Sequence, residues 1–301
     1  MIILIKQRAA VKTVLRIIFN LLTFTLMILT TVVYSLVFFL LLILLYLIPS
    51  KRYRSKTKTK LILPYCSLYY ICFLPFKHCL SVTLHPDPAM PTLSLNNTYI
   101  MLSNHQSWLD VLVIITFLQS QTSCIKFIMK KELLWQLPFA SWFCYMNNYP
   151  MIKRQKDIQS FKHDSDAIRV ACQAMCSTPS TLMIFPEGRR FSQQKKKNKP
   201  TTLEHLLPPK QHGLALSIES IHEHLSGIIN VTIIYRPQKT PIKNILLGKT
   251  QHIDLYYTLI PADQICKKDP LNPTNYKTAF KSWLNTLWQK KDKLIQEHHQ
   301  Q

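Results

Sequence analysis

Residues 99–110, with the sequence YIMLSNHQSWLD, decide the fold, because an apolar run passes through a polar turn into a second apolar run. Tyr99–Ser103 is typical of a short buried strand, and Trp108–Leu118 is expected to be helical. Outward from this segment, further strands are predicted at residues 125–129, 181–185 and 228–235, with helices at 131–142, 157–176 and 277–301. Strands that alternate with helices predict an α/β fold whose functional groups lie at strand ends.

The N-terminal part of the chain predicts a membrane anchor. Residues 17–48 carry no charge and are dominated by Leu, Ile, Val and Phe. This run exceeds the roughly 18 to 20 apolar residues that cross a bilayer. Lysines and arginines flank both ends, so one long tilted helix and a hairpin of two shorter helices both remain open.

The sequence therefore predicts three parts. Residues 1–50 form the anchor. Residues 51–90 begin with a basic linker and continue into an interfacial helix that is interrupted by Pro64 and Pro75. Residues 91–301 form the α/β domain, in which residues 193–199 are expected to be a basic loop.

Composition narrows the classes of function. The 301 residues carry a formal net charge of +22, which favours anionic partners such as phospholipids. Only four glycines are present, and no dinucleotide, P-loop or G-x-S-x-G motif occurs. The basic run Lys195–Lys199 has no interleaved aromatic residues, which argues against nucleic acid. The eight cysteines form no C-x-x-C pair, so reduced thiols and no metal site are expected.

Two polar clusters follow apolar strands and carry candidate chemistry. In Asn104–Asp110, a histidine precedes an aspartate by five residues. An imidazole can remove a proton from a hydroxyl group near neutral pH, and a carboxylate on its other nitrogen fixes the tautomer. In Phe185–Ser192, Glu187 stands beside Arg189 and Arg190. Guanidinium groups match phosphate bidentately, so this cluster suits an anionic substrate.

Together these motifs resemble the lysophospholipid (1-acylglycerol-3-phosphate) acyltransferase family. Asn104–Asp110 matches N-H-x-x-x-x-D, and Phe185–Arg190 matches F-P-E-G-T-R except for arginine at 189. Pro150–Arg154 fits the second motif, although many members have glycine where this chain has Asn147 and Asn148. Pro209–Gly213 with Val231–Tyr235 resembles the fourth motif. In detail, N-H-Q-S-W-x-D, P-K-x-x-G and V-T-I-x-Y are most similar to the bacterial branch related to lysocardiolipin acyltransferases.

The resemblance implies a glycerolphosphate-acyltransferase-like mixed sheet flanked by helices, and an acyltransferase domain at residues 91–301. It implies that His105 is the general base and that Asp110 orients it. It also implies that five other residues bind the acceptor: Asn104, Arg154, Glu187, Gly188 and Arg190.

The implied reaction moves a fatty acyl group from acyl-CoA or acyl carrier protein to the free hydroxyl of a lysophospholipid. It needs no cofactor, metal or covalent acyl-enzyme. The expected partners are the bilayer, the lysophospholipid and the acyl donor. The expected location is the bacterial inner membrane, with the catalytic domain facing the cytoplasm. Because Arg189 stands where the third motif of the family has threonine, the alternative is a catalytically silent lipid-binding protein of the same fold.

Overall fold

A computed structural model describes the chain at residues 2–50, 53, 57, 65, 69–153, 157–197, 201–236, 242–247, 252–265 and 273–300. The chain divides into two compact units, each described by itself below. The first unit contains Met1–Thr83, Ser107–Phe117 and Tyr235–Asp254, and the second contains Leu84–Gln106, Leu118–Ile234 and Leu255–Gln301. These bounds differ from the predicted three-part division, which stays a prediction.

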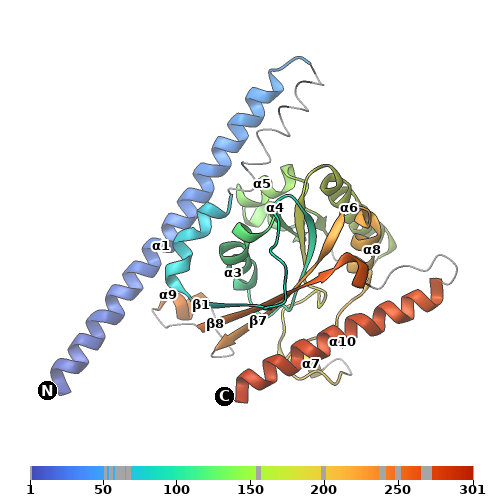
Figure 1. Ribbon diagram of the computed structural model, residues 1–301. Coiled ribbons are helices and arrows are strands. Elements are labelled where there is room, and N and C mark those ends of the chain that lie inside the picture. Colours follow the sequence, from blue (N-terminus) through green and yellow to red (C-terminus); the bar gives the residue numbers. More distant parts are fainter. Residues whose placement is uncertain are drawn as a thin grey trace. The chain divides into compact units, whose positions relative to one another are not determined.

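The first unit is built on one continuous helix, α1 (Ile2–Tyr46) (Figure 1). Ala10–Tyr46 is long and apolar enough to cross a membrane by length and composition. The 3-10 helix η1 (Tyr69–Cys79) packs against α1, with the rings of Phe24 and Phe76 edge to face at 5.3 Å. Asn20 of α1 donates through its side chain to the carbonyl of Ile245 in α9 (Ile242–Leu246), at 2.5 Å. This bond satisfies the buried amide of Asn20 on the side of α1 that contacts protein.

A six-stranded sheet has the order β1-β8-β7-β2-β6-β3. Its neighbours β7, β2, β6 and β3 are mutually parallel, with Leu102 paired to Asn230 on one side and to Ile184 on the other. The carboxyl ends of these parallel strands therefore meet at one edge. The strands are β1 (Ser81–Pro86), β2 (Thr98–Ser103), β3 (Cys124–Phe127), β6 (Ser180–Ile184), β7 (Leu225–Arg236) and β8 (His252–Pro261).

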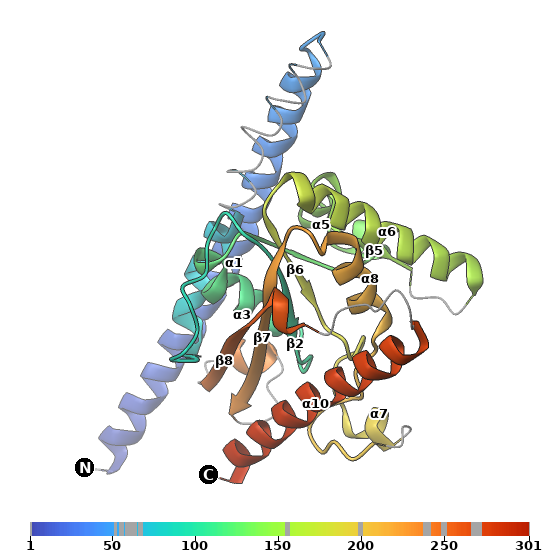
Figure 2. The same ribbon diagram turned by 45° about the vertical axis from the view of Figure 1, so that its right-hand side comes forward.

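In the second unit, three helices enclose a core against one face of the sheet: α6 (Ile158–Ser177), α8 (His212–Ile221) and α10 (Pro273–Gln300). Figure 2 shows α10 running along the sheet near β7 and β8. Leu102 and Leu182 from the strands and Trp288 from α10 are fully buried in this core. Helix α10, which Trp288 anchors in this core, also contains Lys291 and Asp292.

Shorter elements complete the chain. A separate parallel pair is formed by β4 and β5. The remaining short elements of the second unit are η2 (Gln119–Gln121), β4 (Met129–Lys130), α4 (Leu133–Gln136), α5 (Ala140–Met146), β5 (Met151–Ile152), α7 (Gln193–Lys197) and η3 (Ala262–Gln264). Helix α3 (Leu109–Leu118) belongs to the first unit.

The predicted α/β class with a mixed sheet flanked by helices is confirmed. The predicted helix at 131–142 is wrong in detail, because it is two short helices separated at Pro138 and Phe139. Proline disfavours helical backbone in the residue before it, and Phe139 has a φ of 65°. The predicted basic loop at 193–199 is also wrong in part, because residues 193–197 form α7.

Candidate active site

Asn104 continues the sheet by one step after β2 ends. Its side-chain amide donates to the carbonyl of Ile233 at 2.9 Å, and its side-chain oxygen accepts the N–H of Ile233 at 2.8 Å. Asn104 is fully buried, so these two bonds satisfy a polar group that would otherwise destabilise the fold. The pair fixes the end of β2 against β7. Asn104 therefore positions the residue that follows it, and no direct contact with a substrate is needed for this role.

His105 is held at its backbone and at its ring. Its N–H donates to Glu187 Oε1 at 3.0 Å, and its carbonyl accepts the N–H of Phe191 at 2.7 Å. The imidazole stacks on the ring of Phe185, with centroids 4.2 Å apart and an interplanar angle of 21°. Contacts on both sides of the peptide leave the imidazole in a defined place at the carboxyl end of the parallel strands.

Glu187 joins the turn at His105 to a second loop. The side chain is fully buried, and Glu187 Oε2 accepts the N–H of Leu207 at 3.1 Å. The same loop is fixed from α10, because the carboxylate of Asp292 accepts the N–H groups of Glu204 and His205, both at 2.7 Å. Bonds to an ionised acceptor are stronger than neutral ones. The buried carboxylates of Glu187 and Asp292 thus stabilise the turn and the loop that hold His105 in place.

Gly188 has a φ of +68°, a conformation that favours glycine. Its N–H closes a turn onto the carbonyl of Phe185 at 2.9 Å. A Cβ at this position would lie 3.5 Å from Nζ of Lys210, so Gly188 and Lys210 are close neighbours. Arg190 is half-buried, and its carbonyl accepts from Nζ of Lys195 at 3.0 Å. Arg189, the departure from the motif, is exposed.

Asp110 lies in the first unit, since the division falls between Gln106 and Ser107. It is fully buried in the first turn of α3. Its Oδ2 accepts the N–H of Ser107 at 2.9 Å, while Ser107 Oγ accepts the N–H of Leu109 at 3.2 Å. This reciprocal arrangement is a capping box. Asp110 therefore has a structural role at the start of α3.

Tyr235 is the second partner of Asp110. Its hydroxyl donates to Asp110 Oδ1 at 2.6 Å. Burial, followed by the Asp110 charge, raises the pKa of Tyr235 well above its ordinary value. Tyr235 hence stays protonated, and its hydroxyl orients the Asp110 carboxyl group.

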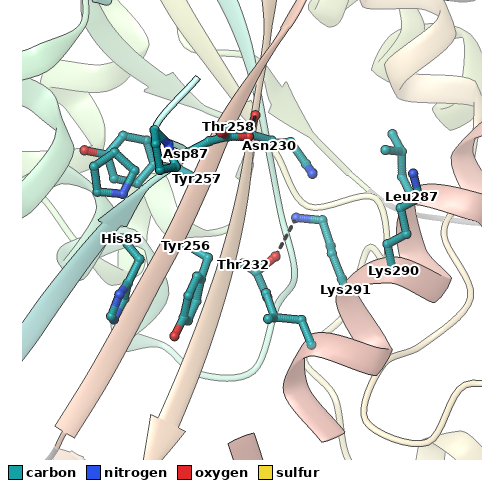
Figure 3. Close-up of a pocket in the computed structure, with 13 residues that line it drawn as sticks. His85, Asp87, Asn230, Thr232, Tyr256, Tyr257, Thr258, Leu287, Lys290 and Lys291 are labelled. Atoms are coloured by element: carbon teal, nitrogen blue, oxygen red, sulfur yellow. Dashed lines mark hydrogen bonds between the residues drawn. The ribbon is translucent and has the colours of Figure 1, made fainter. Parts of the chain in front are cut away.

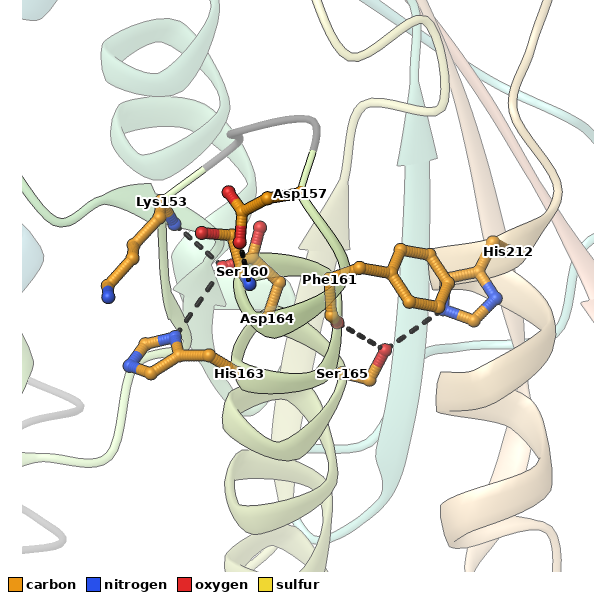
Figure 4. Close-up of polar contacts among 8 residues, drawn as sticks. All are labelled: Lys153, Asp157, Ser160, Phe161, His163, Asp164, Ser165 and His212. Carbon is orange, nitrogen blue, oxygen red and sulfur yellow. Dashed lines mark hydrogen bonds and ion pairs between the residues drawn. The ribbon is translucent and has the colours of Figure 1, made fainter.

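The second motif, Pro150–Arg154, includes β5 and precedes α6, and Arg154 falls outside the described residues. Its neighbour Lys153 donates its N–H to Asp164 Oδ1 at 2.7 Å, as Figure 4 shows. Asp157 caps α6 by accepting the N–H of Ser160 at 2.8 Å. That bond lowers the pKa of the Asp157 carboxyl, because it stabilises the charged form. These contacts fix the start of α6.

The structure brings together Asn104, His105, Glu187, Gly188 and Arg190 in the second unit. Sequence reasoning missed Asp292 and the pairing of Tyr235 with Asp110. Tyr235 belongs to the strand of the fourth motif, and its hydroxyl group was the one feature that could have indicated a polar partner such as Asp110. Among the described residues, no group of three or more His, Cys, Asp or Glu side chains could hold a metal ion.

Comparison with known proteins shows the family of the chain. Residues 82–236 match the model of the Acyltransferase family, and this segment includes all five residues of the second-unit site. The match covers just over half of the chain. The chain therefore belongs to the Acyltransferase family.

Among curated proteins, the chain is 26% identical to human 1-acyl-sn-glycerol-3-phosphate acyltransferase delta over 186 residues, which cover 58% of this chain and 45% of that protein. It is 25% identical to the Macaca fascicularis protein of the same name over 253 residues, covering 79% of this chain and 63% of the relative. The chain thus spans about half to under two thirds of the length of these relatives.

A solved structure, the 1-acyl-sn-glycerophosphate (LPA) acyltransferase PlsC from Thermotoga maritima, is 16% identical. It aligns with a TM-score of 0.48 over 92% of this chain and 97% of that chain. The predicted resemblance to acylglycerol-phosphate acyltransferases is confirmed at the level of the family, and its bacterial branch stays a prediction.

Proposed function

We propose that the protein is a membrane-bound acyltransferase that moves a fatty acyl group onto the free glycerol hydroxyl of a lysophospholipid such as 1-acylglycerol-3-phosphate. The observation that carries the proposal is the fixed backbone of His105, which Glu187 holds at the carboxyl end of β2. Membership of the Acyltransferase family and the names of the curated relatives support the reaction class.

In the proposed mechanism, the His105 imidazole removes the proton from the acceptor hydroxyl as its oxygen attacks the thioester carbonyl. The tetrahedral intermediate collapses with cleavage of the carbon–sulfur bond, and the imidazolium returns the proton to the leaving thiolate. The resemblance to the family assigns to Asp110, five residues further along the chain, the role of stabilising the imidazolium and fixing its tautomer. General-base catalysis of this kind contributes about 10²–10⁴-fold, so positioning of the two substrates supplies the remainder.

Arg190 and Arg154 are proposed to bind the acceptor phosphate, since guanidinium groups pair with phosphate in two-point contacts. Glu187 and Gly188 shape the acceptor site through the turn that they form. Acyl-CoA and acyl carrier protein both remain open as donors. The apolar helix α1 would hold the enzyme at the bilayer that contains the acceptor, with the catalytic domain in the cytoplasm and, for a bacterial protein, at the inner membrane.

The test is acyl transfer by membranes that contain the protein. Labelled acyl-CoA or acyl carrier protein would be offered with lysophosphatidic acid, lysophosphatidylglycerol and lysocardiolipin. Transfer that is lost in His105→Ala supports the proposal, and the acceptor ranking names the substrate. No transfer with either donor would refute it and favour the silent lipid-binding alternative. Arg189→Thr, measured on the same acceptors, tests whether the exposed arginine sets headgroup preference.

A further inference from the structure

A pocket of about 390 Å³ lies in the second unit, between α10 and one face of the sheet (Figure 3). Its volume falls in the range of about 300–1,000 Å³ that is common for small-molecule sites. The walls come from the end of β1, from β7 and β8, and from α10. The α10 and β8 walls lie wholly outside the segment that matches the family model.

The pocket contains a buried cation. Lys291 is 2% exposed, and its ammonium group donates to the carbonyl of Val231 and to Thr232 Oγ1, the latter at 3.4 Å. In the part of the chain that the structure describes, no carboxylate forms an ion pair with it. The Trp288 ring lies 5.4 Å from Nζ, which compensates the charge only in part. A buried ammonium group without an ion-pair partner destabilises a fold, and the Glu187 charge compensates it only in part because the pKa of Lys291 is still lowered, so an anion in the pocket would be favoured.

The pocket also contains a buried acceptor that lacks a donor. Asn230 Oδ1 is buried and has no hydrogen-bond partner among the described residues. Asn230 and Thr232 are two residues apart on β7, so their side chains share the face that Lys291 approaches. An occupant that satisfies both groups must offer anionic oxygens to Lys291 and a hydroxyl donor to Asn230.

Other charges at the pocket favour a multiply charged anion. Lys290 lines the pocket and is exposed, so two ammonium groups come from consecutive residues of α10. Asp87 is the one acidic residue in the lining. Its Oδ2 accepts the Thr258 hydroxyl at 3.1 Å, and its Oδ1 accepts the N–H of Ala89 at 3.0 Å. The Asp87 carboxylate is therefore already hydrogen-bonded, on the side of the pocket that β1 and β8 form.

We propose that this pocket binds a phosphate monoester that carries a neighbouring hydroxyl group, with the phosphate on Lys291 and Lys290 and the hydroxyl on Asn230. Two sources share this chemistry. One is a glycerol phosphate headgroup, and the other is the ribose of CoA, where a 3′-phosphate stands next to a 2′-hydroxyl. Binding here requires no acyl transfer, so the proposal goes beyond the proposed reaction and can fail independently of it.

Proton uptake gives this site a distinctive signature. Burial lowers the pKa of Lys291 to about 7, and the Glu187 charge opposes that shift. The other titratable groups that line the pocket are Lys290 on the same helix, His85 of β1, Asp87 just after β1, and Tyr256 and Tyr257 of β8. A bound phosphate favours the ammonium form of Lys291. At pH 8, binding should therefore take up close to one proton at each site.

The experiment is isothermal titration of the full-length protein in detergent at pH 8, in two buffers of different ionisation enthalpy. The probes are glycerol 3-phosphate, CoA and 3′-dephospho-CoA. Glycerol 3-phosphate binding with proton uptake identifies a lipid headgroup site. Tighter binding of CoA than of 3′-dephospho-CoA, with proton uptake, identifies a donor site.

Variants separate this site from the catalytic one. Lys291→Met should weaken binding at least tenfold and abolish proton uptake, whereas Lys293→Met, on an exposed position of the same helix, should change neither. Asn230→Asp places a carboxylate beside Lys291 and should also abolish binding while the fold is retained, which covers a failure of Lys291→Met to fold. His105→Ala should bind as the native chain does. Binding without proton uptake, equal binding by Lys291→Met and Lys293→Met, or no binding by any probe would overturn the proposal.

Discussion

Replacing Glu187 with glutamine should loosen the turn at His105, because the carboxylate accepts two backbone N–H groups at once. Its oxygens bond the N–H of His105 at 3.0 Å and of Leu207 at 3.1 Å. Glutamine keeps one acceptor and turns an NH₂ group toward the other N–H. One charge-assisted bond is then lost inside the protein, at about 1.5–3 kcal/mol. We expect Glu187→Gln to lower the free energy of unfolding by about 1.5–3 kcal/mol.

The assay is chemical denaturation of the full-length protein in detergent, with acyl transfer measured on the same samples. The matched control is Glu204→Gln on the loop that Asp292 holds, since the Glu204 side chain is 60% exposed. Exposed substitutions of this kind usually change stability by less than about 0.5 kcal/mol. Activity should fall with Glu187→Gln and persist with Glu204→Gln. Equal stability and activity of the two variants would refute the role assigned to Glu187.

Three further predictions follow from buried contacts. Gly227→Ala should lower stability by about 1–3 kcal/mol in denaturation experiments, because a Cβ would lie 2.6 Å from the carbonyl oxygen of Ile260; an unchanged midpoint would contradict the close approach of β7 and β8. Tyr235→Phe removes the 2.6 Å bond to Asp110 and should cost about 1.5–3 kcal/mol, measured in the same way; native stability would show that the bond is not formed. The pKa of Lys291 is lowered to about 7 from 10.5, so between these values the unfolded chain binds more protons. Stability should therefore rise with pH above 7, by up to about 1.4 kcal/mol per pH unit, relative to Lys291→Met; parallel curves for the two proteins would exclude this linkage.

The parallel centre of the sheet was predictable because its strands are apolar runs that end in polar turns. Residues 99–103 and 181–185 correspond to β2 and β6 within one residue at their bounds. β8 was not predicted, since HIDLYYTLIP mixes polar and apolar residues and its burial is irregular. Helix α8 was also missed. Its packing against α6 comes from contacts distant in sequence, which a local pattern does not encode.

The site was predictable where the chemistry is local to a motif. His105, Glu187 and Gly188 stand in short polar clusters after strands, and the structure brings them together. The supports from α10 were not predictable, because Asp292 contacts a loop 87 and 88 residues earlier in the chain. Nothing in the polar sequence around Lys291 indicates that its ammonium group is buried.

The central claim is that acyl transfer proceeds directly to the acceptor with His105 as the general base. It is tested most directly by mixing the enzyme with labelled acyl-CoA, or with labelled acyl carrier protein if that is the active donor. The protein is denatured before and after one turnover with lysophosphatidic acid. The account predicts no label on the protein without acceptor, labelled phosphatidic acid after acceptor is added, and no product with His105→Ala. Label bound covalently to the protein, or native transfer by His105→Ala, would contradict it.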